Sequence, residues 1–332
     1  ANSTQQPTDT SDSTQQACTN NGVQRTSNNQ NFAFANETPI WSPPSPAAHQ
    51  ENETTENPWE PDSSVSHCTP SSNLFKLLDI DPNDDNDRRM IDADAIIREV
   101  QQNPHDADLM YSFSPNSDFK RCCPLHQAIL LGLGIEVIDA LSSSSIAIQQ
   151  KCNGATALHI ALYGWSNEKN DVSRDVVALL LEKHPKAVRE KDKKGKTPLH
   201  LVCQHNKSLD VLSLLLSVWS DAAKEEDNEG LTPLHIACQY KASLDVVSSL
   251  LDSWPDAAKQ KNKRNFGQTP LHHACQYKAS LDVVSMVLCS WPDAAKEKND
   301  YGHTPLYLAC RYGASLDVVS TVLSSWPDAV KQ

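Results

Sequence analysis

The four residues Thr197-Pro198-Leu199-His200 form a block that recurs unchanged at 232–235 and at 269–272. A further copy at 304–307 ends in tyrosine, and weaker copies stand at 123–126 and 156–159. The leucines of the six copies are Leu125, Leu158, Leu199, Leu234, Leu271 and Leu306, so successive copies lie 33, 41, 35, 37 and 35 residues apart. A period of this length indicates stacked repeats and not a single globular core.

Each block has the features of a helix N-terminus. Thr232 provides a capping oxygen, and Pro233 suits the first helical position because an N–H there would have no partner. After a turn, Ser243 is a second capping residue, and the apolar residues that follow it keep helical spacing as far as Trp254. The sequence therefore predicts a short helix, a longer helix and an extended connection over 257–267. Such a helix pair cannot bury its own apolar faces and must stack on like neighbours.

This unit resembles the ankyrin repeat, whose pattern is Gly-x-Thr-Pro-Leu-His-x-Ala followed by a second helix rich in Val and Leu. The resemblance covers residues 120–332. It departs from the family where the second helix begins, with Ser-Leu-Asp-Val, and where it ends, with Trp-Pro-Asp-Ala-Ala-Lys. The resemblance implies an all-α solenoid of about six helix-turn-helix repeats with extended connections. The glycines that permit positive φ ahead of the first helix are Gly195, Gly230, Gly267 and Gly302.

Composition divides the chain into three parts. Residues 1–71 are dominated by Ser, Thr, Asn, Gln and Pro, with one basic residue against eight acidic ones, so we expect a disordered tail. Residues 91–100, followed by Pro104, resemble a second helix and its exit. We therefore interpret 72–104 as an N-terminal helical cap or degenerate half-repeat, and 105–332 as the repeat domain.

Net charge and the lack of long apolar runs argue against several functional classes. A formal net charge of −13 argues against nucleic-acid binding, and no apolar run approaches the roughly 18 residues that span a bilayer. Without a signal-peptide layout we expect a cytoplasmic protein, with the nucleus as the alternative. Four cysteines each follow a block leucine by four residues, and we expect them to be buried, unbridged thiols: Cys203, Cys238, Cys275 and Cys310.

No catalytic, metal or cofactor site is expected. The sequence contains no Gly-x-Ser-x-Gly, P-loop or His-Glu-x-x-His motif, so we predict a protein that is not an enzyme and has no cofactor. The block histidines are single residues about one repeat apart, which favours hydrogen bonds to the neighbouring connection over metal binding. These histidines are His126, His159, His200, His235 and His272. The tryptophans that end the second helices are interpreted as packing residues.

The candidate binding residues are those that vary while their surroundings repeat. In ankyrin-like proteins, the turn tips and the end of the first helix face a concave groove. Transferred to this chain, these positions are Lys193, Lys194, Lys196, His205, Glu229, Tyr240, Phe266, Tyr277, Tyr301, His303, Arg311 and Tyr312. Aromatic side chains and arginine are enriched at binding hot spots. Alternatively, the tyrosines are a by-product of near-identical repeats.

The resemblance thus implies a non-catalytic scaffold that binds a protein partner through this groove and the turn tips. The alternative is a regulatory or targeting module of a larger enzyme or membrane protein that continues beyond Gln332. Lysines in the connections, among them Lys259, Lys261, Lys296 and Lys298, weakly favour an acidic partner. The partner's identity and the oligomeric state do not follow from the sequence, because such stacks bind unrelated targets with one architecture.

Overall fold

The computed structural model describes residues 72–81, 89–113, 121–163, 174–264 and 266–328, all within one compact unit, Ser63–Gln332. The tail predicted for residues 1–71 lies outside the described residues. Across the described ranges the regular structure is helical, with two isolated β-bridges and no strand. This confirms the predicted all-α class.

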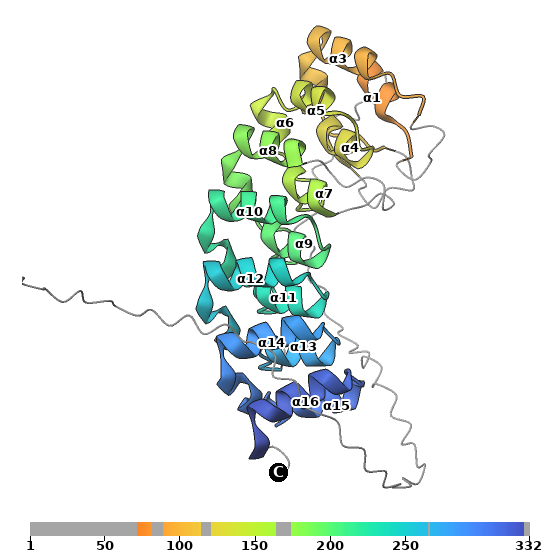
Figure 1. The fold of residues 1–332 in the computed structure, drawn as a ribbon. Coiled ribbons are helices and arrows are strands. Elements are labelled where there is room, and N and C mark those ends of the chain that lie inside the picture. The colour runs from red at the N-terminus through yellow and green to blue at the C-terminus, as the bar shows by residue number, and fades with distance from the viewer. Residues whose placement is uncertain (1–71, 82–88, 114–120, 164–173, 265, 329–332) are drawn as a thin grey trace, which may run out of the picture. The chain divides into compact units, whose positions relative to one another are not determined.

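The helices form pairs that stack in two layers (Figure 1). The first helices are α4 (Pro124–Leu130), α7 (Ala157–Tyr163), α9 (Pro198–Gln204), α11 (Pro233–Gln239), α13 (Pro270–Gln276) and α15 (Pro305–Tyr312). The second helices are α5 (Ile135–Leu141), α8 (Arg174–Lys183), α10 (Leu209–Val218), α12 (Leu244–Ser253), α14 (Leu281–Ser290) and α16 (Leu316–Ser325). Each first helix packs on the next first helix, and each second helix on the next second helix.

Two further helices, α1 (Asn73–Leu78) and α3 (Ala93–Gln102), precede this stack and pack on α4 and α5. A short helix, α6 (Ser145–Gln149), follows α5. Helix α3 ends just before Pro104, as the sequence indicated, and is followed by a 3-10 turn, Pro104–Asp108, which the sequence did not indicate. The boundaries proposed at 72–104 and 105–332 stay predictions.

The Thr-Pro-Leu-His block joins neighbouring pairs through its histidine. His200 Nδ1 accepts the backbone N–H of Thr197 at 3.2 Å and lies 2.8 Å from the Thr197 hydroxyl. Because Nδ1 accepts, the ring proton is on Nε2, which donates to the Leu231 carbonyl of the next connection at 3.0 Å. Burial lowers the pKa of His200 to about 4, which keeps the ring neutral.

The same link occurs at three other joints and confirms the predicted structural role. The pairs are His159 Nε2 with the Lys196 carbonyl (3.1 Å), His235 with Gln268 (3.2 Å) and His272 with His303 (3.1 Å). His126 differs because cysteine replaces the capping threonine. Its Nδ1 lies 3.0 Å from Cys123 Sγ, and its buried Nε2 has no partner among the described residues. For His126 the prediction was therefore wrong.

The connections are not extended throughout, which corrects the prediction for 257–267. A 3-10 turn covers Pro255–Lys259, and equivalent turns follow α8, α10 and α14. Proline at the first position favours this turn, and Ala257 and Ala258 are buried by it. The connection between α10 and α11 shows how the part after such a turn is held. There, Asp227 Oδ1 accepts the backbone N–H groups of Glu229 and Leu231, both at 2.9 Å.

Glycine lets successive connections approach closely. Gly195 has φ +74°, and a Cβ there would lie 2.4 Å from Asn228 Oδ1 and 2.7 Å from Asn228 N. Asn228 in turn donates its backbone N–H to the Lys194 carbonyl at 3.0 Å. At Gly302 the φ is similar, +77°, but a Cβ would meet nothing within 4 Å among the described residues.

The core runs through the stack between the two helix layers. The block leucines are buried in the first five copies, and Cys203, Cys238 and Cys275 are fully buried beside them. Cys310 is exposed, which corrects the prediction for the fourth cysteine: no described helix pair covers it. The four tryptophans after the second helices are half-buried against the core, which confirms their packing role: Trp219, Trp254, Trp291 and Trp326. No helix in the described ranges is long and apolar enough to cross a membrane.

Candidate partner-binding surface

Three tyrosines form a row at the C-terminal ends of consecutive first helices. Tyr240 and Tyr277 cap α11 and α13, and Tyr312 is the last residue of α15. Their exposed fractions are 43%, 36% and 42%. Partial burial raises the pKa of Tyr277, with further contributions from Tyr240, Tyr312 and Glu229. We call these three residues the tyrosine row.

The upstream positions in register with this row are built into the scaffold. Tyr163 Oη donates to Asp192 Oδ2 at 2.5 Å, and the Tyr163 ring meets the His205 ring edge-on at a centroid distance of 6.0 Å. Burial lowers the pKa of His205, with Lys207 and Lys196 acting in the same direction. Tyr163 and His205 thus present less open surface than the three tyrosines of the row.

The connection before α9 presents a basic tip. Lys193 and Lys194 are exposed, whereas Lys196 is half-buried. Lys196 Nζ bonds Gln204 Oε1, and Lys193 Nζ bonds Asn153 Oδ1. Burial lowers the pKa of Lys196. In the next connection, Glu229 is exposed, so the sign of charge changes from one tip to the next.

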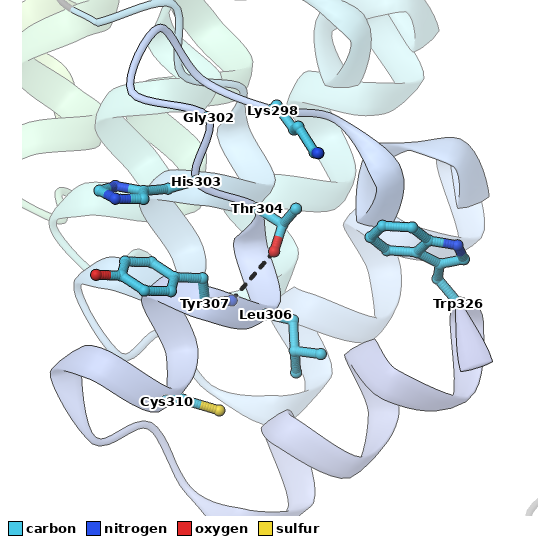
Figure 2. Close-up of a pocket in the computed structure, with 8 residues that line it drawn as sticks. All are labelled: Lys298, Gly302, His303, Thr304, Leu306, Tyr307, Cys310 and Trp326. Atoms are coloured by element: carbon cyan, nitrogen blue, oxygen red, sulfur yellow. Dashed lines mark hydrogen bonds between the residues drawn. The ribbon is translucent and has the colours of Figure 1, made fainter. Parts of the chain in front are cut away.

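An aromatic cluster occupies the tips before α13 and α15. We call Phe266, Tyr301, His303 and Tyr307 the tip cluster; their successive ring centroids are 5.0, 5.9 and 4.1 Å apart. Figure 2 shows the last two members of this cluster, His303 and Tyr307, with their rings stacked. Tyr301 is 63% exposed, Phe266 47% and Tyr307 41%.

Sequence reasoning missed Tyr307 as a surface residue. Arg311 Nη1 donates to Tyr307 Oη at 2.9 Å, so the two side chains act together. The signal was present in the sequence: tyrosine stands where the other copies have a buried histidine, one helical turn before Arg311. A large phenol at that place indicates that the position is not enclosed.

The lysines of the connections mostly pair within the protein. Lys259, Lys261 and Lys296 lie 2.7 Å from carboxylates of Asp256, Glu297 and Asp293 respectively. Whether these lysines favour an acidic partner stays a prediction. In the part of the chain that the structure describes, no group of three or more His, Cys, Asp or Glu side chains could hold a metal ion.

Comparison with protein families identifies the C-terminal part of the stack. The family model described as ankyrin repeats (3 copies) matches residues 168–261 and again 244–331. The chain is an ankyrin repeat protein. A search of curated proteins gave no match. One helix pair, α4–α5, and the first helix of the next pair, α7, lie upstream of the matched residues, so the count of six ankyrin repeats stays a prediction.

One residue of the tip cluster is held in a strained conformation. Phe266 has φ +67°, a region that costs an L-residue about 1–2 kcal/mol and that glycine occupies freely. Such strain is found at functional sites when the surroundings hold it in place. Here the Phe266 carbonyl accepts the backbone N–H of Asp300 at 2.9 Å, which holds the turn of this ankyrin repeat.

We expect Phe266→Gly to raise the free energy of unfolding by about 0.5–1 kcal/mol, because strain is relieved at some cost in chain entropy. Urea titration followed by circular dichroism measures this change. The matched control, Phe266→Leu, removes the ring but keeps a Cβ at positive φ and should give no gain. Equal shifts in both variants would show that no backbone strain is stored at this position.

Proposed function

We propose that this ankyrin repeat protein is a non-catalytic scaffold that binds a protein partner through the tyrosine row and the connection tips. Ankyrin repeats are generally protein-interaction modules and are typically non-catalytic. The observation that carries the proposal is the row itself: three half-exposed tyrosines at equivalent ends of consecutive helices. Tyrosine offers large contact area and a polar hydroxyl at low conformational cost, which is why it is enriched at interface hot spots.

The connection tips extend this surface. Lys193, Lys194 and Lys196 lie at one tip, and the tip cluster with Arg311 lies at others, so the proposed surface combines basic and aromatic groups. Its supports are rigid, because the histidine links tie each connection to the preceding first helix. We place this activity in the cytoplasm, since no disulfide joins the described cysteines and six of them are buried thiols.

The double variant Tyr240→Ala/Tyr277→Ala tests the proposal. Partners captured by the wild-type chain are identified by mass spectrometry, and the dissociation constant of a purified partner is then measured by titration calorimetry. We expect binding at least about tenfold weaker, since hot-spot tyrosines contribute about 2 kcal/mol each. The free energy of unfolding should change by less than about 0.5 kcal/mol per exposed site.

Val218→Ala is the matched control, because Val218 is 43% exposed but lies at the end of a second helix, α10. It should leave the dissociation constant unchanged. If the double variant binds its partner as tightly as the control does, the tyrosine row is a by-product of repetition and the proposal fails.

A further inference from the structure

The first joint of the stack lacks a polar bond that the four later joints share. At each later joint the block histidine of one repeat donates to a carbonyl of the next connection, as His200 does to Leu231. At the first joint, between α4 and the connection before α7, the corresponding nitrogen of His126 has no partner among the described residues. The histidine link therefore does not tie these two repeats together.

The connection before α7 also differs in how its turn is held. In the four later connections an Asp or Asn oxygen accepts backbone N–H groups of its own turn, as Asp192 does from Lys194 and Lys196 at 2.8 Å. Cys152 takes this place, because its backbone N–H is donated to the Ala155 carbonyl just as that of Asp192 is donated to Lys196. A thiol is a weak acceptor, so cysteine cannot support the turn as Asp and Asn do.

The Cys152 side chain contacts the connection of the preceding repeat instead. Its Sγ donates to the Arg121 carbonyl at 3.0 Å, and the residue after Arg121 is Cys122. The two thiols share a hydrogen bond, and this bond together with burial raises the pKa of Cys122. Both side chains are fully buried. Two sulfur atoms from residues thirty positions apart in the sequence are thus in contact across the first joint.

This pairing of cysteines is peculiar to the first joint. At the later joints the two equivalent positions carry Ala155 and Asp192, Lys196 and Asp227, Leu231 and Asn262, and Gln268 and Asn299. A third cysteine of the first joint, Cys123, is engaged elsewhere, since its Sγ lies 3.0 Å from His126 Nδ1 and 3.8 Å from the Ala147 carbonyl. The structure thus singles out Cys122 and Cys152 as the pair that sulfur chemistry could join.

We propose that Cys122 and Cys152 form a reversible disulfide, which joins the connection before α4 to the connection before α7. The bond supplies at the first joint the tie that the histidine link supplies at the others. Its formation removes two protons and two electrons, and a low-molecular-weight disulfide such as oxidised glutathione accepts them. One protein thiolate attacks the oxidant and releases a thiol; the second thiolate then attacks the mixed disulfide and releases another thiol.

Burial sets the conditions for this reaction. The thiolate is the attacking species, and the raised pKa keeps Cys122 protonated at neutral pH. Because both sulfur atoms are also shielded from solvent, the joint must open locally before the first attack. The missing histidine link at His126 lowers the free energy of that opening relative to the later joints. A reducing compartment keeps the pair as thiols, and an oxidising one converts it to the disulfide.

The test uses the full chain with serine in place of four cysteines outside the joint: Cys18, Cys68, Cys289 and Cys310. The folded protein is incubated at neutral pH in glutathione buffers of increasing oxidised fraction and quenched with acid. Remaining thiols are alkylated with N-ethylmaleimide, and tryptic peptides are identified by mass spectrometry. Trypsin cleaves after Arg121 and Lys151, so the disulfide links peptide 122–151 to peptide 152–169. We expect most chains to carry this link in the most oxidising buffer, with the alkyl group on Cys123.

Two substitutions serve as matched controls. Cys152→Ser should abolish the link, whereas Cys123→Thr, which restores the threonine of the other blocks, should leave it unchanged. A further measurement needs no substitution at the joint: the disulfide form should melt roughly 5 °C or more above the reduced form of the same chain, because closing a loop of this length restricts the unfolded state. Circular dichroism measures both melting temperatures.

Three results would overturn the proposal. The first is alkylation of both Cys122 and Cys152 in the most oxidising buffer. The second is a disulfide that involves Cys123 in place of Cys122. The third is a disulfide form that melts below the reduced form, because the bond would then strain the joint and not tie it.

Discussion

Acidification from pH 7 to pH 4 is expected to unfold this ankyrin stack. Burial lowers the pKa of four block histidines to about 4: His126, His200, His235 and His272. In the unfolded chain the same side chains titrate near 6.5. The unfolded state therefore binds more protons between these two values, and the free energy of unfolding falls as the pH is lowered through this window.

The size of the effect follows from the difference in pKa. At pH 5 each of these histidines has lost about 2 kcal/mol of its contribution, and at pH 4 about 3 kcal/mol. Four such losses are comparable to the 5–15 kcal/mol that stabilises a typical domain. Exposed ion pairs such as Lys259 with Asp256 contribute far less to this pH dependence, because solvent screens them.

Urea titrations at pH 7, 6, 5 and 4.5, followed by far-ultraviolet circular dichroism, measure this dependence. Imidazole proton signals in nuclear magnetic resonance provide the matching site-specific readout: the buried rings should stay neutral down to the pH at which the chain unfolds. A free energy of unfolding that stays constant from pH 7 to pH 5 would contradict the buried neutral histidines.

Gly195→Ala is expected to lower the free energy of unfolding by about 3 kcal/mol or more, whereas Gly302→Ala should cost only about 1–2 kcal/mol. Both glycines have positive φ, so both substitutions carry the same left-handed penalty. At Gly195 the new Cβ would also lie 2.7 Å from the backbone N of Asn228. That atom cannot move away without losing its hydrogen bond to the Lys194 carbonyl, so crowding adds a further 1–3 kcal/mol or so.

The comparison isolates the close approach of two connections, because the backbone conformation is shared and only the neighbour differs. Urea unfolding monitored by tryptophan fluorescence is suitable, since Trp219 packs on the core at the end of the helix pair α9–α10, which begins just after Gly195. Equal losses in the two variants would show that conformation alone, and not contact between repeats, requires glycine at these places.

Much of the stack could be predicted from residues in contact along the chain. Thr197, Pro198 and His200 specify a helix start by local hydrogen bonding and by the fixed φ of proline, and such effects do not depend on distant segments. The 3-10 turn at Pro255–Lys259 was missed, because burial of Ala257 and Ala258 against the core decides it. Burial depends on neighbours that are distant in sequence.

The candidate binding surface, too, could be predicted from the sequence only in part. The positions of Tyr240, Tyr277 and Tyr312 follow from the repeat period, since equal spacing places them at equivalent helix ends. Their exposure does not follow from it: Tyr163, in register with them, is tied to Asp192 instead. Whether a partner binds the row stays a prediction.

By itself, the sequence determined the repeat, its two helices and the histidine that joins one repeat to the next, because these depend on local capping and on a period. Only the tertiary structure decided that equivalent residues differ in role. Cys275 and Cys310 occupy the same position in their repeats, yet one is fully buried and the other exposed. The physical reason is that burial of a residue in a stacked repeat depends on whether another pair covers it, which its own repeat does not encode.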